Sequence, residues 1–378
     1  PVSDIAQHSL GKMLDKSKNK GELRDYLRNT NVRWFEFDLT DMKQMRFLPE
    51  EEEKYTAEKG DVLICEGGYP GRAAIWCSDE PIHFQKALHR VRFHEPTRNI
   101  WFLYYLFYMD VTGKLREFFT GSGIQHFTGR ALARLPIPLP PLPEQERIVA
   151  ILDEAFAAIA TATANAEKNL ANARELEPST FHFMLEDGDS RLFPTTIGDQ
   201  IQLQRGFDIT KKQQIPGPVP VVSSGGIKSF HSKAMVVGPG VVIGRKGSIG
   251  RVHFVTDDYW PHDTTLWVKD FMGNNPKFVY RFLTAIDLAS LDSGTANPAL
   301  NRNMIHPLPT SWPSVDLQDE IVNKTDEIAS QVQTLERSFT EKLAALTELK
   351  QSILQKAFTG ELTADPGATD RTLAEAGA

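Results

Sequence analysis

Apolar residues recur at intervals of three and four along residues 148–173 and again along residues 321–357. This spacing places a narrow apolar seam on one side of a helix, which is typical of long helices that pair with another long helix. A helix of about 40 residues would extend for roughly 60 Å. The positions expected to form the seam are Ile148, Leu152, Ile159 and Leu170 in the first stretch, and Ile328, Val332, Leu335, Phe339, Leu346 and Ile353 in the second.

Pro178 interrupts the first periodic stretch. Proline lacks the amide hydrogen that a helix interior needs, and its ring clashes with the preceding turn, so the helix is expected to kink or end there. The sequence leaves two outcomes open: the helix stops at Leu176 and a packed turn follows, or residues 181–185 continue it after a break. The acidic residues 186–190 are then expected to form a linker.

The segments outside these helices are rich in glycine, proline and aromatic residues. Short apolar runs at residues 62–64 and 240–243, bounded by turn residues, predict β-strands. Aromatic stretches at residues 100–119 and 276–291 predict one further helix each, and residues 135–143 predict an extended segment. The chain therefore alternates between mixed α/β regions and long helices.

The two halves of the chain repeat one another. Residues 68–72 and 247–251 both read Gly-x-x-Gly-Arg after a short apolar run. Ser122-Gly123 matches Ser293-Gly294 at an offset of 171, and residues 145–149 match residues 318–322 at an offset of 173. Matches in one order with nearly one offset indicate a tandem duplication of about 170 residues.

The composition is that of a globular protein. A length of 378 residues suits two or three domains, with 41% hydrophobic and 24% charged residues. No uninterrupted run of about 18 apolar residues and no leader sequence is visible, so neither a membrane-spanning helix nor secretion is expected. Cys65 and Cys77 are too few for a disulfide framework or a four-ligand zinc site, and we expect two small apolar side chains in neighbouring strands. A cytoplasmic location follows as an expectation.

The net charge of −7 is unevenly distributed. Residues 1–143 carry +1 and residues 191–312 carry +5, whereas residues 144–190 carry −7 and residues 313–378 carry −6. The acidity belongs to the helical segments, so the total charge does not exclude an anionic partner for the other parts.

The motifs of several common enzymes are missing. Arg245-Lys246-Gly247 stands where a phosphate-binding loop would need Gly-Lys followed by serine or threonine. Residues 274–278 (NNPKF) resemble the Asn-Pro-Pro-aromatic motif of adenine methyltransferases, but Lys277 replaces the second proline and no glycine-rich cofactor loop accompanies them. The histidines show no metal-ligand spacing, so the sequence predicts no catalytic residue and no metal.

The repeated Gly-x-x-Gly-Arg motif admits two interpretations. It is a tight turn with a solvent-facing arginine, or a turn whose arginine contacts phosphates or guanine edges. Further donors of the kind that contact phosphates and bases lie in the second half. The DNA-binding candidates are Gly68, Gly71, Arg72, Lys211, Lys212, Ser223, Ser224, Lys228, Arg245, Lys246 and Arg251.

Four segments carry a resemblance to one family. Residues 138–145 (PLPPLPEQ), with Ile148-Val149 and Leu152-Asp153 after them, and residues 348–362 (ELKQSILQKAFTGEL) are similar to the ends of that family's conserved helical regions. Residues 59–68 (KGDVLICEGG) and 85–92 (QKALHRVR) resemble its target-recognition domains. The family is the specificity subunit of type I restriction–modification systems. Residues 177–180 (EPST) depart from its pattern, because the family continues its helix there.

The resemblance implies an α+β fold with pseudo-twofold tandem duplication, in which two α/β target-recognition domains are separated by two long helices packed as an antiparallel coiled coil. The implied boundaries are residues 1–143 and 191–312 for the two domains, 144–190 and 313–362 for the helices, and 363–378 for a flexible tail. Each domain would read one half of a bipartite, asymmetric double-stranded DNA site, with the helices setting the spacing. The chain itself would not be an enzyme.

The implied partners are two modification subunits, which use S-adenosylmethionine to methylate adenine, and two restriction subunits, which use ATP and Mg²⁺ for translocation and cleavage. The chain would carry none of these cofactors. Two alternatives remain at this stage: a stand-alone or fused DNA adenine methyltransferase or nuclease, and a coiled-coil scaffold without DNA specificity.

Overall fold

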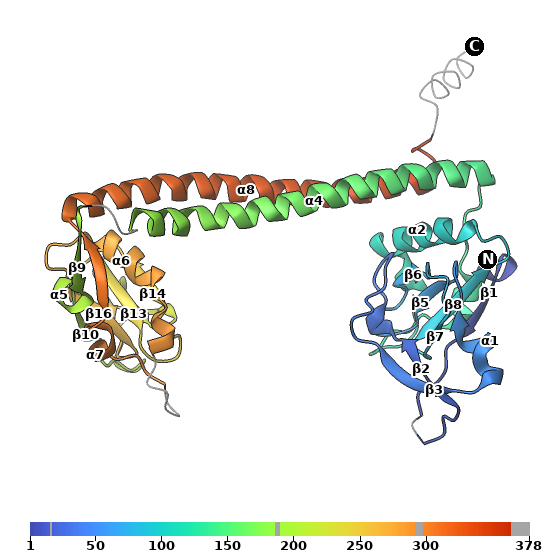
Figure 1. Ribbon diagram of the computed structural model, residues 1–378, viewed down its shortest axis with the longest axis horizontal. Coiled ribbons are helices and arrows are strands. Elements are labelled where there is room, and N and C mark those ends of the chain that lie inside the picture. The colour runs from blue at the N-terminus through green and yellow to red at the C-terminus, as the bar shows by residue number, and fades with distance from the viewer. Residues whose placement is uncertain (16, 186–189, 292–297, 364–378) are drawn as a thin grey trace, which may run out of the picture. The chain divides into compact units, whose positions relative to one another are not determined.

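The computed structural model describes residues 1–15, 17–185, 190–291 and 298–363 (Figure 1). The linker expected at residues 186–190, the repeat match at Ser293-Gly294 and the tail expected at residues 363–378 therefore lie outside the described residues, apart from Ser190 and Thr363. The chain divides into two compact units. Unit 1 combines Pro1–Asn165 with Lys342–Ala378, and unit 2 is the continuous segment Ala166–Glu341.

Unit 1 begins with a mixed α/β region. Its first four-stranded sheet has the order β1-β8-β5-β6 and is antiparallel, and its second has the order β3-β2-β7-β4, with β2 and β7 parallel. The elements of this region are η1 (Val2–Asp4), β1 (Ala6–Leu10), β2 (Glu22–Leu27), η2 (Asn29–Asn31), β3 (Lys43–Phe47), η3 (Pro49–Glu51), α1 (Glu52–Tyr55), β4 (Thr56–Ala57), β5 (Val62–Cys65), β6 (Ala73–Ile75), β7 (Ile82–Phe84), β8 (Leu88–Phe93), α2 (Arg98–Val111), η4 (Lys114–Phe118) and α3 (Gly129–Arg134).

Unit 2 contains counterparts of both sheets, although its second sheet has three strands where that of unit 1 has four. The first has the order β10-β16-β13-β14, and the second has the order β12-β11-β15, with β11 and β15 parallel; a two-stranded sheet β17-β9 is added. The elements are β9 (Leu192–Thr196), α5 (Ile197–Gln200), β10 (Gln202–Arg205), β11 (Val219–Ser223), β12 (Gly226–His231), β13 (Gly240–Gly244), β14 (Val252–Val255), β15 (Trp260–Pro261), β16 (Thr265–Asp270), α6 (Pro276–Ala285), η5 (Leu288–Leu291), α7 (Arg302–Ile305) and β17 (Pro309–Pro313).

The predicted strands at residues 62–64 and 240–243 are confirmed as β5 and β13. The predicted helices at residues 100–119 and 276–291 are shorter than expected, because each is interrupted. α2 stops before Gly113, whose φ of 76° is left-handed, and α6 stops where Ile286 becomes extended. Short 3-10 turns, η4 and η5, follow in both units.

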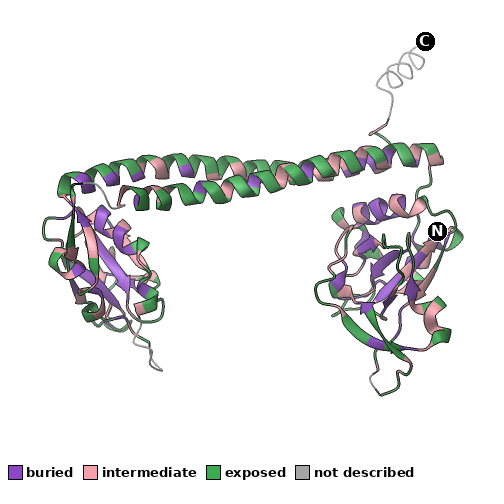
Figure 2. Cartoon of the chain, in the orientation of Figure 1, coloured by how far each residue is buried: buried purple, intermediate pink, exposed green. Residues whose placement is uncertain are grey.

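Two long helices contribute to both units: α4 (Leu142–Met184) and α8 (Val315–Thr359). In unit 1, Lys350 Nζ lies 4.6 Å from the Phe156 ring centroid, and in unit 2 Arg174 Nε donates to Glu336 Oε1 at 2.7 Å. Later residues of α8 thus meet earlier residues of α4, so the two helices pair antiparallel within each unit. Figure 2 shows buried residues recurring along both helices among exposed ones.

The expected seam residues differ in burial. Ile148, Leu152 and Ile159 are buried, as is Val332. Leu335 is 39% exposed and lies towards the solvent. The remaining candidates, which are intermediate in exposure, are Leu170, Ile328, Phe339, Leu346 and Ile353.

The expectation that the helix could end at Pro178 is wrong, because α4 continues through this residue to Met184. The turns on either side of the proline are held by tertiary contacts: Ala173 and Phe181 are buried, and Glu177 is paired with Arg281 of α6. Packing therefore outweighs the one backbone hydrogen bond that the proline removes.

Equivalent side chains fasten α4 and α8 to the two mixed regions. In unit 1, Tyr104 Oη of α2 donates to Asp153 Oδ1 at 2.5 Å. In unit 2, Lys277 Nζ of α6 lies 2.7 Å from Asp326 Oδ2, and Arg281 also binds Asp326. Asp153 and Asp326 are separated by 173 residues, the offset of the repeat. The same helix position therefore holds the preceding short helix in both halves.

By length and composition alone, part of α4 is apolar enough to cross a membrane. Alanines interspersed with polar residues give this composition without an uninterrupted apolar run. Ile148 and Leu152 of α4 lie in the core of unit 1, and Phe181 lies in the core of unit 2. Several apolar residues of the helix are thus used for packing, and one helix of this composition is weak evidence for a membrane span.

Candidate nucleic-acid interface

The first Gly-x-x-Gly-Arg motif forms the tight loop between β5 and β6. Gly68 and Gly71 have φ of 77° and 88°, the left-handed region that glycine adopts at no steric cost. The loop is closed by Cys65 N donating to Arg72 O at 2.8 Å and Gly71 N donating to Cys65 O at 2.9 Å. A side chain on Gly71 would start 2.4 Å from Leu115 Cδ2, so this glycine also permits close packing.

Arg72 of this loop is bound by its own unit. Its Nη2 donates to Asn29 O at 3.0 Å, and its guanidinium lies 4.8 Å from the Tyr69 ring centroid. Arg72 therefore joins the β5–β6 loop to η2, while Gly68 leaves space for the Asn29 side chain.

The second motif forms the equivalent loop between β13 and β14. Gly247 and Gly250 have φ of 81° and 76°. Gly244 N donates to Arg251 O at 2.7 Å, and Gly250 N donates to Gly244 O at 2.9 Å, as in the first loop. Arg251 differs from its counterpart Arg72: it is exposed, and its side chain forms no hydrogen bond or ion pair with a described residue.

Thr264 accepts hydrogen bonds from several of the predicted DNA-binding residues of unit 2. The backbone N–H groups of Arg245 and Lys246 both donate to its carbonyl oxygen, at 2.8 and 3.1 Å, and Ser224 N donates to its hydroxyl at 3.4 Å. The turn between β11 and β12 thereby lies beside the β13–β14 loop. Ser223 and Ser224 are each only 7% exposed, and the Ser223 hydroxyl donates to Gly226 O at 3.0 Å.

The other basic candidates of unit 2 are spread over exposed turns and strands. Lys211 and Lys212 follow β10, Lys228 lies on β12, and Lys246 lies beside Gly247. Within the described part of unit 2, none of these lysines forms an ion pair. Their charges are thus available to an external anion. Among the described residues, no hydrogen bond joins Lys211 or Lys212 to Thr264, Ser224, Arg245 or Lys246.

The mixed region of unit 1 has a different charge arrangement. Arg92 pairs with Asp61, Lys12 pairs with Glu51, and Lys59 lies 2.7 Å from Asp79. Many of its cations are therefore neutralised internally, and its surface offers less free positive charge than that of unit 2.

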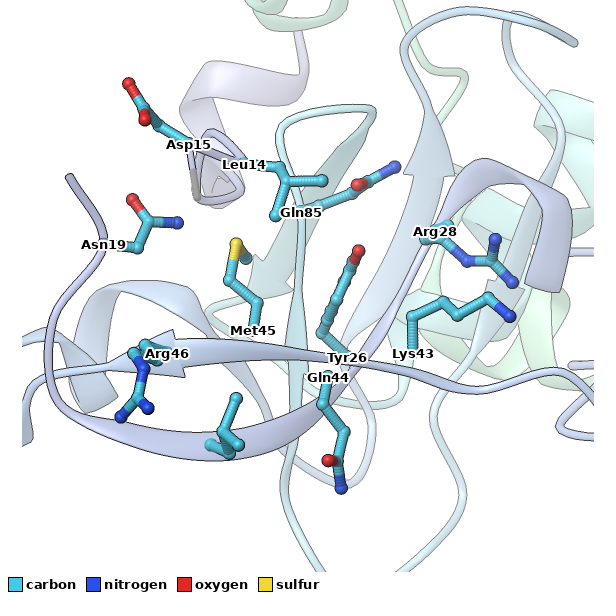
Figure 3. Close-up of a pocket in the computed structure, with 11 residues that line it drawn as sticks. Leu14, Asp15, Asn19, Tyr26, Arg28, Lys43, Gln44, Met45, Arg46 and Gln85 are labelled. Carbon is cyan, nitrogen blue, oxygen red and sulfur yellow. The ribbon is translucent and has the colours of Figure 1, made fainter. Parts of the chain in front are cut away.

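A cavity of about 540 Å³ lies on unit 1 beside β2 and β3 (Figure 3). Figure 3 shows Tyr26 and Gln44 among its lining residues, together with the cations Arg28, Lys43 and Arg46. Arg28 and Lys43 both bind Asp41, at 2.8 and 2.7 Å, and Arg46 Nη1 donates to Gly21 O. The cavity is therefore lined by cations that are already partnered.

His253 and Thr264 were missed by sequence reasoning. His253 Nε2 lies 3.1 Å from Ser224 O and, as a donor, holds the β11–β12 turn against β14. Isolated histidines and threonines carry no motif, and only the fold brings residues 224, 253 and 264 together. No signal in the sequence could have identified them.

The two cysteines do not behave alike. Cys65 is buried at the end of β5, and burial raises the pKa of its thiol to about 11, so it is a neutral apolar side chain at pH 7. The expectation for Cys77 is wrong: it is exposed, because β6 ends at Ile75 and Trp76 takes the buried position.

Among the described residues, one cluster of side chains has metal-ligand spacing: Asp208, His262 and Asp263. Asp263 is already paired with Arg205 at 2.9 Å and with His262 Nδ1 at 3.0 Å. Arg205 already neutralises Asp263, and we assign no metal to the cluster.

Residues 274–278 take structural roles. The Asn275 side chain accepts from Lys277 N at 2.9 Å and Phe278 N at 3.3 Å, which caps α6, and Pro276 occupies the first turn. Asn274 Oδ1 accepts from Trp312 Nε1 at 2.8 Å. The likeness to a methyltransferase motif is therefore explained by the start of a helix.

The sequence is similar to that of known proteins. Residues 1–170 match the family model described as "Type I restriction modification DNA specificity domain". The type I restriction enzyme EcoBI specificity subunit of Escherichia coli is 24% identical over 345 residues, covering 77% of this chain and 72% of the relative. The EcoDI specificity subunit, also of Escherichia coli, is 36% identical over 91 residues, covering 23% of this chain and 20% of the relative.

Two solved structures share the fold. A chain from a study of complex assembly and conformational transition of the type I R-M system has a TM-score of 0.76 at 16% identity, covering 96% of this chain and 97% of the other. The HsdS subunit from Thermoanaerobacter tengcongensis has a TM-score of 0.60 at 16% identity, covering 96% of both chains. The expected fold class is thus confirmed.

Proposed function

Through residues 1–170 the chain belongs to the type I restriction modification DNA specificity family, and from this premise we propose that each of its two units reads one half of a bipartite, asymmetric DNA site. One observation carries the proposal: a pair of corresponding sheets and the same glycine-closed loop occur in both units. Side chains at the loops differ between the units. Two units with the same backbone arrangement but different loop side chains are suited to recognising different bases.

We propose that α4 and α8 set the spacing between the half-sites. α4 has 43 residues and α8 has 45, and a helix of this length extends for about 65 Å. That length corresponds to roughly two turns of DNA, at about 34–36 Å per turn. Because each helix takes part in both units, a change in helix length would change the spacing that the protein accepts.

The partners belong to the same proposal. As a specificity subunit the chain is the non-catalytic member of a restriction–modification complex that acts on DNA. We infer two modification subunits with S-adenosylmethionine, which methylate adenine, and two restriction subunits with ATP and Mg²⁺. The complex would work in the cytoplasm, and this chain would hold no cofactor of its own.

Mapping of adenine methylation in cells with and without this chain tests the proposal. We expect a bipartite motif with a fixed gap to be methylated only when the chain and its modification subunits are both present. Methylation of adenine by the purified chain with S-adenosylmethionine alone would show an enzyme instead. Absence of any sequence preference with the partners present would favour a scaffold.

A further inference from the structure

The two units share more than strand order: eight backbone hydrogen bonds recur at equivalent positions around the two loops. They fix the loop to its neighbouring strands in the same way in both units. In unit 1 they are Gly11 N–Leu88 O, Lys12 N–Phe84 O, Gln85 N–Leu27 O, Leu88 N–Gln85 O, Glu66 N–Ala87 O, Phe127 N–Glu66 O, Cys65 N–Arg72 O and Gly71 N–Cys65 O. In unit 2 they are Gly206 N–Thr265 O, Phe207 N–Pro261 O, His262 N–Val222 O, Thr265 N–His262 O, Arg245 N–Thr264 O, Leu300 N–Arg245 O, Gly244 N–Arg251 O and Gly250 N–Gly244 O.

One position of this frame reverses its charge between the units: Glu66 in unit 1 is Arg245 in unit 2. Each is the first residue after its strand, β5 or β13. The N–H of each donates at 2.8 Å to a carbonyl, that of Ala87 or Thr264, and the carbonyl of each accepts a backbone N–H at 2.7 or 2.9 Å. Because the backbone is held on both sides, the two side chains leave equivalent, rigid positions.

Neither side chain is fully used by its own unit. The Glu66 side chain is 20% exposed, and its carboxylate Oε1 lies 3.7 Å from His126 Nδ1. Arg245 is partly exposed and forms no ion pair with a described residue. Its Nη1 is buried without a hydrogen-bond partner, whereas Nε and Nη2 are not buried and form no hydrogen bond with a described residue, so they are the donors left for a ligand. Both therefore have hydrogen-bonding capacity left for a ligand.

The chemistry of the two groups matches opposite base edges. A guanidinium presents paired donors that fit the O6 and N7 acceptors of guanine, whereas a carboxylate accepts from the N4 amino group of cytosine. In unit 2 the neighbouring cations Lys246 and Arg251 would hold the adjacent phosphates. In unit 1 the equivalent residues are Gly67 and Arg72, and Arg72 is bound within the unit by Asn29 O. Neither of them therefore adds a free cation beside the Glu66 carboxylate.

We propose that the position shared by Glu66 and Arg245 determines specificity, with Arg245 reading a guanine in the half-site of unit 2 and Glu66 reading a cytosine amino group in the half-site of unit 1. This inference rests on the proposed function, since it assumes that each unit reads one half-site.

The test uses the full chain in complex with its modification subunits and DNA libraries in which each half-site is varied one base pair at a time. Glu66→Gln and Arg245→Gln are compared with the exposed-site controls Glu80→Gln and Lys269→Gln. We expect Arg245→Gln to lose discrimination by roughly 5- to 150-fold at one G·C pair of one half-site. Glu66→Gln should lose it at one C·G pair of the other, and both controls should retain the wild-type profile.

Each result has one meaning. If the wild-type complex shows no bipartite preference, the proposed function fails. If the wild type is bipartite and both variants keep its profile, this inference is overturned while the proposed function stands. Uniform weakening across all sequences, with half-site preferences unchanged, would also overturn it, because it would show a phosphate contact or a structural role; circular dichroism of the variants separates the two.

Discussion

At the residue scale, the glycines of the two loops were predictable and their neighbours were not. Gly-x-x-Gly-Arg was recognisable because glycine is the residue that adopts a positive φ without strain, and both motif glycines in each loop do so. The difference between Arg72, which binds Asn29, and Arg251, which is exposed, depends on contacts from distant segments. Such contacts leave no local pattern in the sequence.

Gly250→Ala should destabilise unit 2 more than Gly247→Ala. Both glycines have positive φ, so both changes strain the backbone by about 1 kcal/mol. The new carbon at position 250 would also lie 2.7 Å from Ala289 N, whereas at position 247 its nearest neighbour is Ser224 Oγ at 3.4 Å. We expect Gly250→Ala to cost about 3 kcal/mol in total, measured by urea unfolding. Equal losses for the two variants would contradict this.

His89 should make unit 1 acid-sensitive. It is 2% exposed, and burial lowers its pKa to about 4, so it stays neutral in the folded state. Below pH 6.5 the unfolded chain takes up a proton that the folded chain does not, so stability falls as the pH drops from about 6.5 to 4. The loss approaches about 3 kcal/mol at pH 4.

Hydrogen exchange of the β5 and β8 amides, compared between pH 7 and pH 4.5, would measure this loss. His89→Gln should remove that part of the pH dependence, and the exposed His94→Gln should leave it unchanged. An identical pH dependence in His89→Gln and the wild type would exclude His89 as the cause.

At the element scale, the apolar spacing predicted both long helices, because seam residues repeat with the turn of the helix. The effect of Pro178 was not predictable, since it depends on the contacts that Phe181 and Glu177 make with α6. The beginnings of α4 and α8 likewise use buried glutamines whose role appears only in the fold. Gln145 Nε2 donates to Pro140 O at 2.7 Å, and Gln318 Nε2 donates to Pro313 O at 3.0 Å.

Gln318→Ala should lower the free energy of unfolding by removing hydrogen bonds at the start of α8. The fully buried Gln318 amide also donates to Asn274 Oδ1 at 2.6 Å and accepts from Asn275 N at 2.9 Å. Alanine would leave these buried groups without partners, which should cost at least about 3 kcal/mol. Thermal unfolding provides the measurement. The exposed Gln331→Ala on the same helix should change the unfolding free energy by less than about 0.5 kcal/mol, and a similar effect of both variants would refute the assignment.

At the scale of the whole molecule, the duplication and the segregation of charge were readable from the sequence. Repeat matches keep their order because each half builds the same frame, and the acidic residues concentrate in the helical segments. The cations of residues 191–312 that remain unpaired, such as Lys228 and Lys246, identify unit 2 as the more strongly anion-attracting part. The base sequence recognised depends on loop geometry and was not predictable.

The isolated chain should therefore bind duplex DNA weakly and with a steep dependence on salt. Few cations are free to contact phosphates and the helical segments are acidic, so the affinity should be low. What binding remains would be electrostatic, and two or three phosphate contacts are enough for the affinity to fall by at least about tenfold between about 50 and 200 mM salt. Fluorescence anisotropy over that range measures the slope. Lys246→Gln should reduce the slope, and Lys59→Gln, whose parent lysine is already paired with Asp79, should not. Tight binding by the isolated chain at high salt would contradict this prediction.

The division of the chain has a consequence for its synthesis. Unit 2 is one uninterrupted segment, whereas the core of unit 1 includes Leu354 and Ala357 from the last helix. The ribosome makes the chain from its N-terminus at about 5–20 residues per second. All of unit 2 therefore leaves the exit tunnel before Leu354 and Ala357, which unit 1 needs to complete its core. The second half of the duplication therefore completes its fold first. The first half is synthesised earlier, but the part of its core that contacts the end of α8 stays exposed until that end has been synthesised.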